Sequence, residues 1–246
     1  FGLSEDQIFF QDNVKKFLED NAPLDVIRNI SKGEDPNQKN EIHSGIINLG
    51  INNILVPEEH GGLGLDLLFA TAISQSIGGA VAPLPYCGSY VMAPIAIQIG
   101  ASKSQKENIF NEMSSGNTKF GIAFSEYFGS RGSSSINFSN EKINGKTIFA
   151  IDCDYATDVL VSDASGKIGI VSIEDKNIEI VDLITVDKTR TYKEIKFSNA
   201  NVEILENTKK NTDAIEKALD AGRIITAADT LGASQAMLDK AVSYSK

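Results

Sequence analysis

The amino-acid sequence predicts an α+β protein with several domains, in which a helical bundle is followed by a β domain and then by the first helix of a second helical bundle. Apolar residues recur at helical spacing through the first half of the chain. Short segments rich in Ile, Val, Phe and Thr then alternate with turns, and helical spacing returns near the end. We therefore expect an N-terminal α-helical domain at residues 1–117, a middle β domain at 118–208 and the start of a C-terminal helical domain, incomplete, at 209–246.

The first helix is expected to begin at a capping box. Ser4 and Gln7 have the spacing at which each side chain bonds the backbone N–H of the other. Val14 and Leu18 then lie on one apolar face, and the helix ends before Pro23, because proline removes a backbone donor. The sequence therefore opens with a capped amphipathic helix.

Further helices follow in the rest of this domain. Residues 31–39 are polar and predict a loop, after which an amphipathic helix ends at Gly50. Asp66 follows a glycine-rich turn and is expected to cap the next helix. The apolar segment 90–99 is expected at the centre of the bundle, and 102–115 is expected to be amphipathic. The helix before Gly50 is expected to point four side chains inward: Ile42, Ile46, Ile47 and Leu49.

The middle domain is expected to be a small antiparallel barrel or sandwich. Six segments have the length and composition of strands, and turns such as Asn144–Gly145 and Ser165–Gly166 are expected among them. The expected strands are 134–138, 142–151, 159–162, 168–173, 178–181 and 192–197.

Beyond residue 212, one long helix is expected to reach the last residue, with an apolar face that includes Ile215, Leu231 and Val242. A face this apolar must be buried, and the segment ends at Lys246 without a capping signal. The sequence therefore predicts that the natural protein continues or that another chain covers this face. We expect an oligomer for the same reason.

Composition and charge exclude several kinds of function. The formal charge of −10 at pH 7 disfavours binding to nucleic acid or to anionic membranes, and no apolar run approaches the roughly 18 residues of a membrane span. With two cysteines and two histidines, a disulfide framework, a metal site and most histidine-based triads are not expected. The chemistry is expected to come from carboxylates or a cofactor. Because the first residues lack the features of a signal peptide, we expect a cytoplasmic protein.

The order of these elements and one motif carry a resemblance to a known family. Residues 49–51, Leu-Gly-Ile, lead into Val56–Asp66, which has the sequence V-P-E-E-H-G-G-L-G-L-D. This motif resembles the acyl-CoA dehydrogenase family, although its glycines also suit a sharp turn between two helices. The resemblance covers the whole chain. It implies a flavoprotein oxidoreductase of fatty acid metabolism that binds FAD and acyl-CoA.

The segment 122–130 resembles the strand and loop with which this family binds flavin. The resemblance implies that Phe124 offers its backbone and Ser125 its hydroxyl to the flavin. It also implies that Ser130 is a donor to flavin or to acyl-CoA. Fixed donors there would stabilise the negative charge of the reduced ring. Taken without the family, both serines also suit hydrogen bonds to the strand and turn backbone.

The hairpin at residues 143–161 resembles the part of the family that brings an aromatic residue and a small hydroxyl residue against the flavin. The count implies Phe149 at the aromatic position and Ile151 at the hydroxyl position. Phe149 can pack on the ring face, whereas Ile151 cannot donate a hydrogen bond. Without the resemblance, both are ordinary residues of a strand core.

The start of the long helix resembles the part of the family that lines the acyl-CoA pocket. It implies that Asp220 and Arg223 bind substrate, and their spacing also suits a plain salt bridge. In the family a glutamate takes the α proton while the β hydrogen passes to flavin N5, and in some branches it stands just before this arginine. Gly222 occupies that position here, so the catalytic residue is unknown. Glu126 and Glu216 are poor substitutes by position.

Three functions remain open. The first is α,β-dehydrogenation of an acyl-CoA thioester by an FAD-dependent acyl-CoA dehydrogenase whose glutamate lies beyond Lys246. The second is a degenerate, noncatalytic member that binds acyl-CoA or a partner chain without oxidation, and the third is a structural or interaction module. The resemblance implies a homo-oligomer, dimer or tetramer, or a heteromer with a related subunit. It also implies an electron-transfer flavoprotein as electron acceptor.

Overall fold

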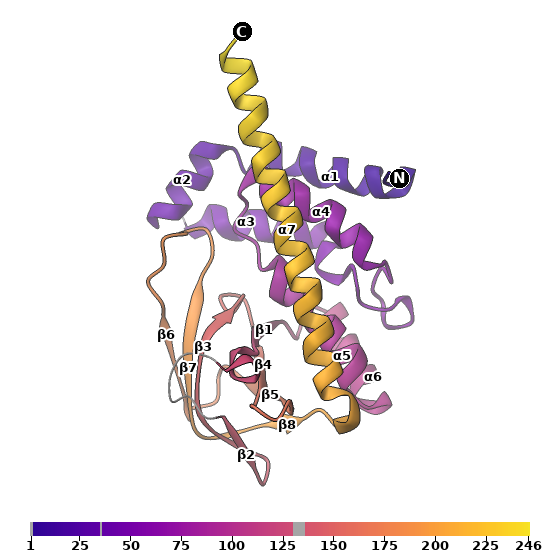
Figure 1. The fold of residues 1–246 in the computed structure, drawn as a ribbon, viewed down its shortest axis with the longest axis vertical. Helices are drawn as coiled ribbons and strands as arrows, with labels where there is room; N and C mark the ends of the chain where they lie inside the picture. Colours follow the sequence, from indigo (N-terminus) through magenta and orange to yellow (C-terminus); the bar gives the residue numbers. More distant parts are fainter. Residues whose placement is uncertain (1, 35, 130–135) are drawn as a thin grey trace.

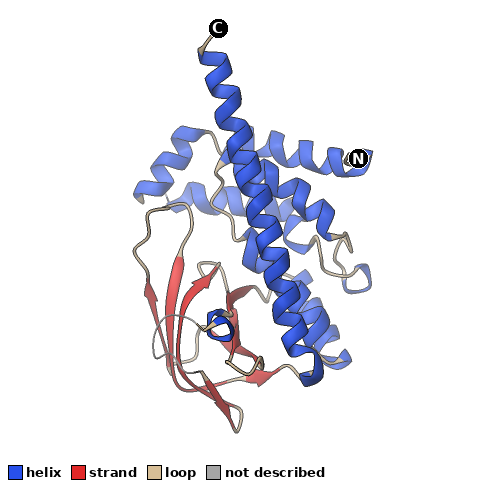
Figure 2. Ribbon diagram, viewed as in Figure 1, coloured by secondary structure: helices blue, strands red, loops and turns tan. Residues whose placement is uncertain are grey.

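The computed structural model describes residues 2–34, 36–129 and 136–246, and Figure 1 shows their arrangement. Helices from the first half of the chain pack beside a β-sheet from the middle of the chain (Figure 2). The long helix α7 (Asn211–Tyr244) runs along both parts, and its C-terminal end extends past the other helices. The predicted fold class of helical, β and helical parts is confirmed, whereas the domain boundaries at 117 and 208 stay predictions.

Local capping explains where two of the helices begin. Before α1 (Glu5–Asn21), Ser4 and Gln7 each accept a hydrogen bond from the backbone N–H of the other, which confirms the predicted capping box. Asp66 caps α4 (Leu67–Ala80) through two N–H groups of its first turn. The other helical elements of this part are α2 (Leu24–Lys32), α3 (Pro36–Asn48), η1 (Ile51–Asn53), η2 (Glu58–His60), the π-helix η3 (Tyr86–Met92), α5 (Ala93–Gly100) and α6 (Lys103–Ser114).

The segment 31–39, expected to be a loop, is mostly helical. Helix α2 continues to Lys32 and ends where Gly33 adopts a left-handed conformation with φ of 76°. Helix α3 then begins at Pro36, because proline suits the first turn of a helix. Four side chains at α3 and its end were expected to point inward. Ile42 and Ile46 are buried and Ile47 is half-buried, whereas Leu49 is exposed.

The middle of the chain forms a mixed sheet with the strand order β6-β7-β3-β1-β4-β5-β8, and β2 pairs with β3. One pairing differs from the expected antiparallel arrangement, because β1 lies parallel to β4. The chain makes the β2–β3 hairpin between these two strands, and parallel neighbours need such a long connection. The strands are β1 (Phe120–Ala123), β2 (Asn137–Ser139), β3 (Lys142–Ile151), β4 (Asp158–Ser162), β5 (Ile168–Ser172), β6 (Ile178–Asp182), β7 (Tyr192–Asn201) and β8 (Glu203–Ile204), with the short helical turns η4 (Ser125–Phe128) and η5 (Thr208–Lys210).

The turn between β2 and β3 lies earlier than expected. Asn140 and Glu141, with φ of 49° and 58°, form a two-residue hairpin turn. Asn144 and Gly145, expected at a turn, instead lie inside β3 at an irregularity in its pairing with β7. The expected turn at Ser165–Gly166 is confirmed between β4 and β5.

Helix α7 packs so closely on α4 that both helices carry glycine at the contact. A Cβ on Gly78 would lie 2.0 Å from the carbonyl oxygen of Asp229. A Cβ on Gly232 would lie 1.9 Å from the carbonyl oxygen of Gln75. One face of α7, as far as Gly232, is therefore covered by the N-terminal helices. Most of its exposed large apolar residues lie in the distal part, at Leu231, Met237, Leu238 and Val242, and Ile224 is exposed as well.

A buried histidine joins the helical part to the sheet. His43 of α3 stacks on Tyr155, which follows β3, with ring centroids 3.9 Å apart, and its Nε2 lies 2.7 Å from the Tyr90 hydroxyl. Burial, followed by the charges of Lys119 and Lys39, lowers the pKa of His43 to about 4. The imidazole is therefore neutral at pH 7.

Replacing Gly78 with alanine is expected to lower the free energy of unfolding by about 2 kcal/mol or more, because the new methyl group would push the backbone of α7 away. Gly79→Ala is the matched control. Its Cβ would lie 3.5 Å from the carbonyl oxygen of Gly232, which is an ordinary contact, and alanine favours the helix by about 1 kcal/mol. Denaturant unfolding followed by circular dichroism measures both variants. Equal stability of the two would contradict the close contact of α4 and α7.

The neutral His43 is expected to make stability depend on pH. The unfolded chain binds a proton at this side chain near its ordinary pKa of 6.5, whereas the folded chain binds it near pH 4. Stability is therefore lost as the pH falls from about 6.5 to about 4, by at most about 3 kcal/mol. In the variant His43→Gln this contribution disappears, so urea unfolding at several pH values should show a flatter profile. A profile that keeps the same slope would exclude His43 as its source.

Candidate functional site

A cleft of about 630 Å³ opens where the sheet, the π-helix η3 and α7 meet. Most of the side chains that line it are apolar. Its strand wall includes Ile122, Phe124, Ser125, Phe149, Ile151 and Tyr192. Its helix wall includes Cys87, Met92, Leu219, Gly222, Arg223 and Thr226.

Phe149 faces the cleft because β3 is irregular at this residue. The pairing of β3 with β7 shifts register between Thr147 and Ala150, and Phe149 has a left-handed backbone with φ of 58°. The side chain leaves the regular alternation of the strand, and 55% of the residue is exposed. Phe149 is therefore not a residue of the strand core, and it forms part of the cleft wall.

Phe124 and Ser125 line the cleft just after β1. Phe124 is buried, so its contribution to the cleft is small in area. The Ser125 hydroxyl donates to the carbonyl oxygen of Ile148 at 2.7 Å and lies 3.0 Å from the Thr147 hydroxyl. Its proton therefore bonds the neighbouring strand, which is the backbone role that the sequence left open. Ser130 lies outside the described residues.

Ile151 brings no polar group to the cleft. It pairs with Ile122 of β1 and with Tyr192 of β7, and it is half-buried. Its side chain lines the cleft between these neighbours. The strand wall is consequently apolar at the position where the resemblance implies a hydroxyl.

Helix α7 places Arg223 on the cleft, whereas Asp220 is not among the lining residues. Arg223 Nη1 donates to Asp220 Oδ1 at 2.7 Å, which confirms the expected pair. Because both side chains are more than half exposed, such a pair contributes less than about 1 kcal/mol to stability. The pair compensates the charge of Arg223 beside the helix wall.

Gly222 leaves room for Met92 in the helix wall. A Cβ on Gly222 would lie 2.8 Å from Met92 Sδ and 3.6 Å from Cys87 Sγ. The Thr226 hydroxyl donates to the carbonyl oxygen of Gly222 at 2.8 Å. A side chain at position 222 would therefore require Met92 to move.

No carboxylate is found among the described residues that line the cleft. Glu216 of α7 accepts a hydrogen bond from the Tyr127 hydroxyl at 3.0 Å and does not line the cleft. Glu126 does not line it either, and Asp152 bonds to the backbone of η3. Within the described residues, the cleft walls thus contain no general base.

The contribution of η3 was not predicted from the sequence. Met92 belongs to the apolar segment 90–99 and Cys87 lies just before it, and this composition indicates burial but not a π-helix. Burial, followed by the charge of Asp152, raises the pKa of the Cys87 thiol to about 12, so the thiol is protonated at neutral pH. Thr226 was not predicted to line the cleft either. Its position one turn after Gly222 on the same helix is the one sequence signal that could have identified it.

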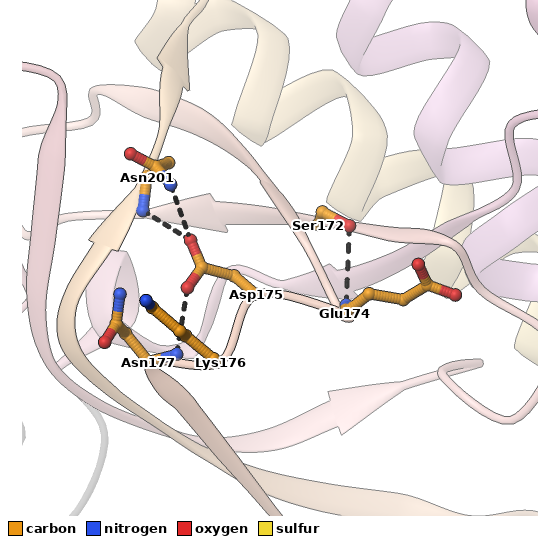
Figure 3. Close-up of a pocket in the computed structure, with 6 residues that line it drawn as sticks. All are labelled: Ser172, Glu174, Asp175, Lys176, Asn177 and Asn201. Carbon is orange, nitrogen blue, oxygen red and sulfur yellow. Dashed lines mark hydrogen bonds between the residues drawn. The ribbon is translucent and has the colours of Figure 1, made fainter.

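A second cavity, of about 440 Å³, lies at the β5–β6 turn and is shown in Figure 3. Its Asp175 carboxylate accepts from the backbone N–H of Asn177 at 2.9 Å, and from the backbone and side chain of Asn201 at 2.8 and 3.0 Å. The backbone N–H of Asn201, followed by that of Asn177, lowers the pKa of Asp175. The polar groups of this cavity therefore hold the turn itself together.

The described part of the chain comprises residues 2–34, 36–129 and 136–246. No helix there has the length and apolarity to cross a membrane. No group of three or more His, Cys, Asp or Glu side chains there is arranged to hold a metal ion. We therefore take the cleft as the candidate site.

Comparison with known proteins shows which proteins this chain is similar to. The family model described as the N-terminal domain of acyl-CoA dehydrogenase matches residues 4–117. The probable acyl-CoA dehydrogenase YngJ of Bacillus subtilis (strain 168) is 26% identical over 278 residues, which cover 100% of this chain and 70% of that protein. The chain thus spans about 70% of the length of this relative.

Solved structures share the fold. Butyryl-CoA dehydrogenase from Megasphaera elsdenii matches with a TM-score of 0.80 at 21% identity, over 100% of this chain and 70% of that one. The ChsE4-ChsE5 complex from Mycobacterium tuberculosis matches with a TM-score of 0.82 at 19% identity, over 99% and 67%. At these identities the structural match shows the fold. The family-model match assigns residues 4–117 to the N-terminal domain of acyl-CoA dehydrogenases, and the whole chain is similar to acyl-CoA dehydrogenases in sequence and in fold.

Proposed function

We propose that the chain is part of a flavin-dependent dehydrogenase that oxidises an acyl-CoA thioester across its α,β bond, with FAD as the hydride acceptor. The observation that carries this proposal is the cleft between the sheet, η3 and α7, with Phe149 on one wall and Arg223 on the other. The similarity to acyl-CoA dehydrogenases supports FAD as the cofactor and acyl-CoA as the class of substrate. In such a cleft a flat ring on the strand wall would face a thioester on the helix wall.

The strand wall fits the face of a flavin ring better than it fits the ring's polar edge. Phe149 offers an exposed aromatic face, and Ile151 adds apolar surface. The edge of an isoalloxazine carries carbonyl groups and nitrogens that need hydrogen-bond partners. Ile151 has no such group, and the Ser125 proton is bonded to Ile148. Backbone groups near Phe124 would therefore have to supply the donors.

The residues of the helix wall would bind and orient the acyl-CoA. Bound FAD would supply the hydride acceptor. Met92 and Leu219 would exclude water from the reacting bond. Arg223 would hold a positive charge beside the thioester, with Asp220 limiting its movement. The protonated thiol of Cys87 would add no negative charge beside a developing carbanion.

A second candidate function is that of a noncatalytic family member, which binds acyl-CoA or a partner chain without oxidising it. The observation that favours it is the lack of a carboxylate among the described residues that line the cleft, because abstraction of the α proton needs a base. Gly222 stands at the position where some branches carry the glutamate, and Met92 fills the space beside it. The cleft would then hold a thioester without a proton acceptor.

We propose in addition that the protein forms an oligomer, either with copies of itself as a dimer or tetramer or with a related subunit. The exposed apolar residues on the distal part of α7 support this proposal, since a soluble helix rarely exposes such a face. A cytoplasmic location and an electron-transfer flavoprotein as electron acceptor belong to the same proposal.

Reconstitution of the 246-residue chain with FAD is expected to give a protein with the absorbance band of bound, oxidised flavin. Phe149→Ala is expected to weaken FAD binding at least about fivefold, because aromatic stacking contributes about 1 kcal/mol beyond the buried area. Phe9→Ala is the matched control, since Phe9 of α1 is 65% exposed and does not line the cleft. Fluorescence titration measures the affinity of both variants.

Addition of acyl-CoA to the reconstituted protein without oxygen separates the two candidate functions. Bleaching of the flavin band would support dehydrogenation. Bound flavin that stays oxidised would support the noncatalytic member. A chain that binds no FAD would contradict the dehydrogenase.

Ile151→Thr is expected to tighten FAD binding about threefold to tenfold, because it adds a hydroxyl to the apolar strand wall and a hydrogen bond contributes about 1 kcal/mol. Ile178→Thr on β6 is the matched control, as Ile178 is also a half-buried strand residue but lies outside the cleft. The same titration applies. If both variants change the affinity equally, Ile151 does not face the flavin.

A further inference from the structure

Asp152 follows β3 directly and reaches across to the π-helix η3. Its Oδ2 accepts hydrogen bonds from the backbone N–H of Gly88 at 2.5 Å and from that of Ser89 at 3.3 Å. The backbone of Asp152 is left-handed, with φ of 58°, a conformation that is uncommon outside glycine although aspartate adopts it more readily than most residues. This conformation, together with a carboxylate that bonds two N–H groups of η3, indicates a specific contact.

Helix η3 has no capping side chain of its own. Pro85, the residue before it, makes no side-chain hydrogen bond, although its carbonyl oxygen accepts from Ser89 N–H at 3.2 Å. The first N–H groups of a helix have no partner inside the helix, and here these include Gly88 but not Ser89, which already donates to Pro85. Asp152, which follows β3, provides the hydrogen-bond acceptor that an N-cap side chain would otherwise provide. Its negative charge also suits the positive end of the helix dipole.

This contact joins the two walls of the cleft at one end. Ile151, immediately before Asp152, lines the strand wall, and Cys87, immediately before Gly88, lines the helix wall. Gly88 has no side chain where the two segments meet, and a Cβ there would lie 2.8 Å from Asp152 Oδ2 and 3.0 Å from Ile151 Cγ1. The spacing of the walls at this end thus depends on the bond between Gly88 and Asp152.

Asp152 does not itself line the cleft. Burial raises the pKa of its carboxyl group to about 6, while the N–H groups of Gly88 and Ser89 and the charge of Arg190 lower it. Arg190 in turn pairs with Asp229 of α7 at 2.7 Å. The carboxylate is therefore engaged with η3 and neighboured by a paired arginine, which suits a positioning role and not contact with a substrate.

We propose that Asp152 is a positioning residue that sets the width of the cleft, because it holds η3, with Cys87 and Met92, at a fixed distance from Phe149 and Ile151. Only the identity of the ligands, flavin and acyl-CoA, rests on the proposed function. The contact of Asp152 with η3 is a property of the chain alone.

Two variants of the 246-residue chain test the contact. Asp152→Ala and Asp152→Asn both remove a charge that raises the pKa of the Cys87 thiol, but only Asp152→Asn keeps an oxygen that can accept from Gly88. A maleimide reagent is expected to label Cys87 about tenfold faster in Asp152→Ala than in Asp152→Asn, because the released η3 exposes the thiol. Peptide mapping by mass spectrometry identifies the labelled cysteine. Equal rates in the two folded variants would overturn the proposal.

Asp154→Ala is the matched control for this experiment. Asp154 lies two residues after Asp152 and pairs with Lys39 at 2.7 Å and with Lys193 at 2.9 Å, neither of which belongs to η3. Its removal is expected to leave the labelling rate of Cys87 within about twofold of that of the unchanged chain. A rise as large as that in Asp152→Ala would overturn the assignment to Asp152.

If Asp152→Ala does not fold, hydrogen exchange of the Gly88 and Ser89 amides in Asp152→Asn decides the question. A neutral amide oxygen is a weaker acceptor than a carboxylate, so exchange is expected to be at least about threefold faster than in the unchanged chain. Unchanged exchange at both amides would overturn the proposal.

Titration with FAD separates this inference from the proposed function. Weaker FAD binding by Asp152→Ala than by Asp152→Asn would support the dependence of the ligand site on cleft width, and equal binding would contradict it. If the unchanged chain binds no FAD, the proposed dehydrogenase fails, while the labelling of Cys87 still decides whether Asp152 positions η3.

Discussion

The close contact between α4 and α7 is the constraint on which the candidate site depends. Gly78 and Gly232 let the two helix backbones touch, and the Ser74 hydroxyl donates to the carbonyl oxygen of Ile225 at 2.8 Å. This contact holds α7, from Ile225 to Gly232, against the N-terminal helices, and another face of the helix forms a wall of the cleft. Helix α7 also packs on α5 and on η3, and together with α4 these contacts place it opposite the strand wall that contains Phe149.

The opposite wall includes β3, whose pairing with β7 is irregular near its C-terminal end. Phe149 and Asp152 both have φ of 58°, and they bracket the last two residues of β3. One left-handed residue turns a ring into the cleft, and the other turns a carboxylate toward η3. Strain of this kind persists only where surrounding contacts hold it, and here the pairing of Ala150 and Ile151 with β7 does so.

Sequence reasoning succeeded where the interacting residues are close together in the chain, as in the caps at Ser4 and Asp66. It could not predict the parallel pairing of β1 with β4, the bulge that exposes Phe149, or the bond from Gly88 to Asp152, which joins residues 64 positions apart. The π-helical form of η3, which brings Cys87 to the cleft, follows from packing in the same way. The family resemblance identified positions that periodicity could not, and the structure brings five of those residues onto one cleft: Phe124, Ser125, Phe149, Ile151 and Arg223.

The rotational phase of α7 has a consequence for the chemistry of the cleft. An α-helix turns by about 100° per residue, so a contact that fixes one face fixes every other face. Gly232 lies against the backbone of α4, where a Cβ would clash with Gln75, and with α7 held in this orientation Gly222 and Thr226 face the cleft. A slide of a single residue would present a different set of side chains to any bound molecule. The close contact at Gly232 therefore helps to set which of the 34 residues of the helix can contact a ligand in the cleft.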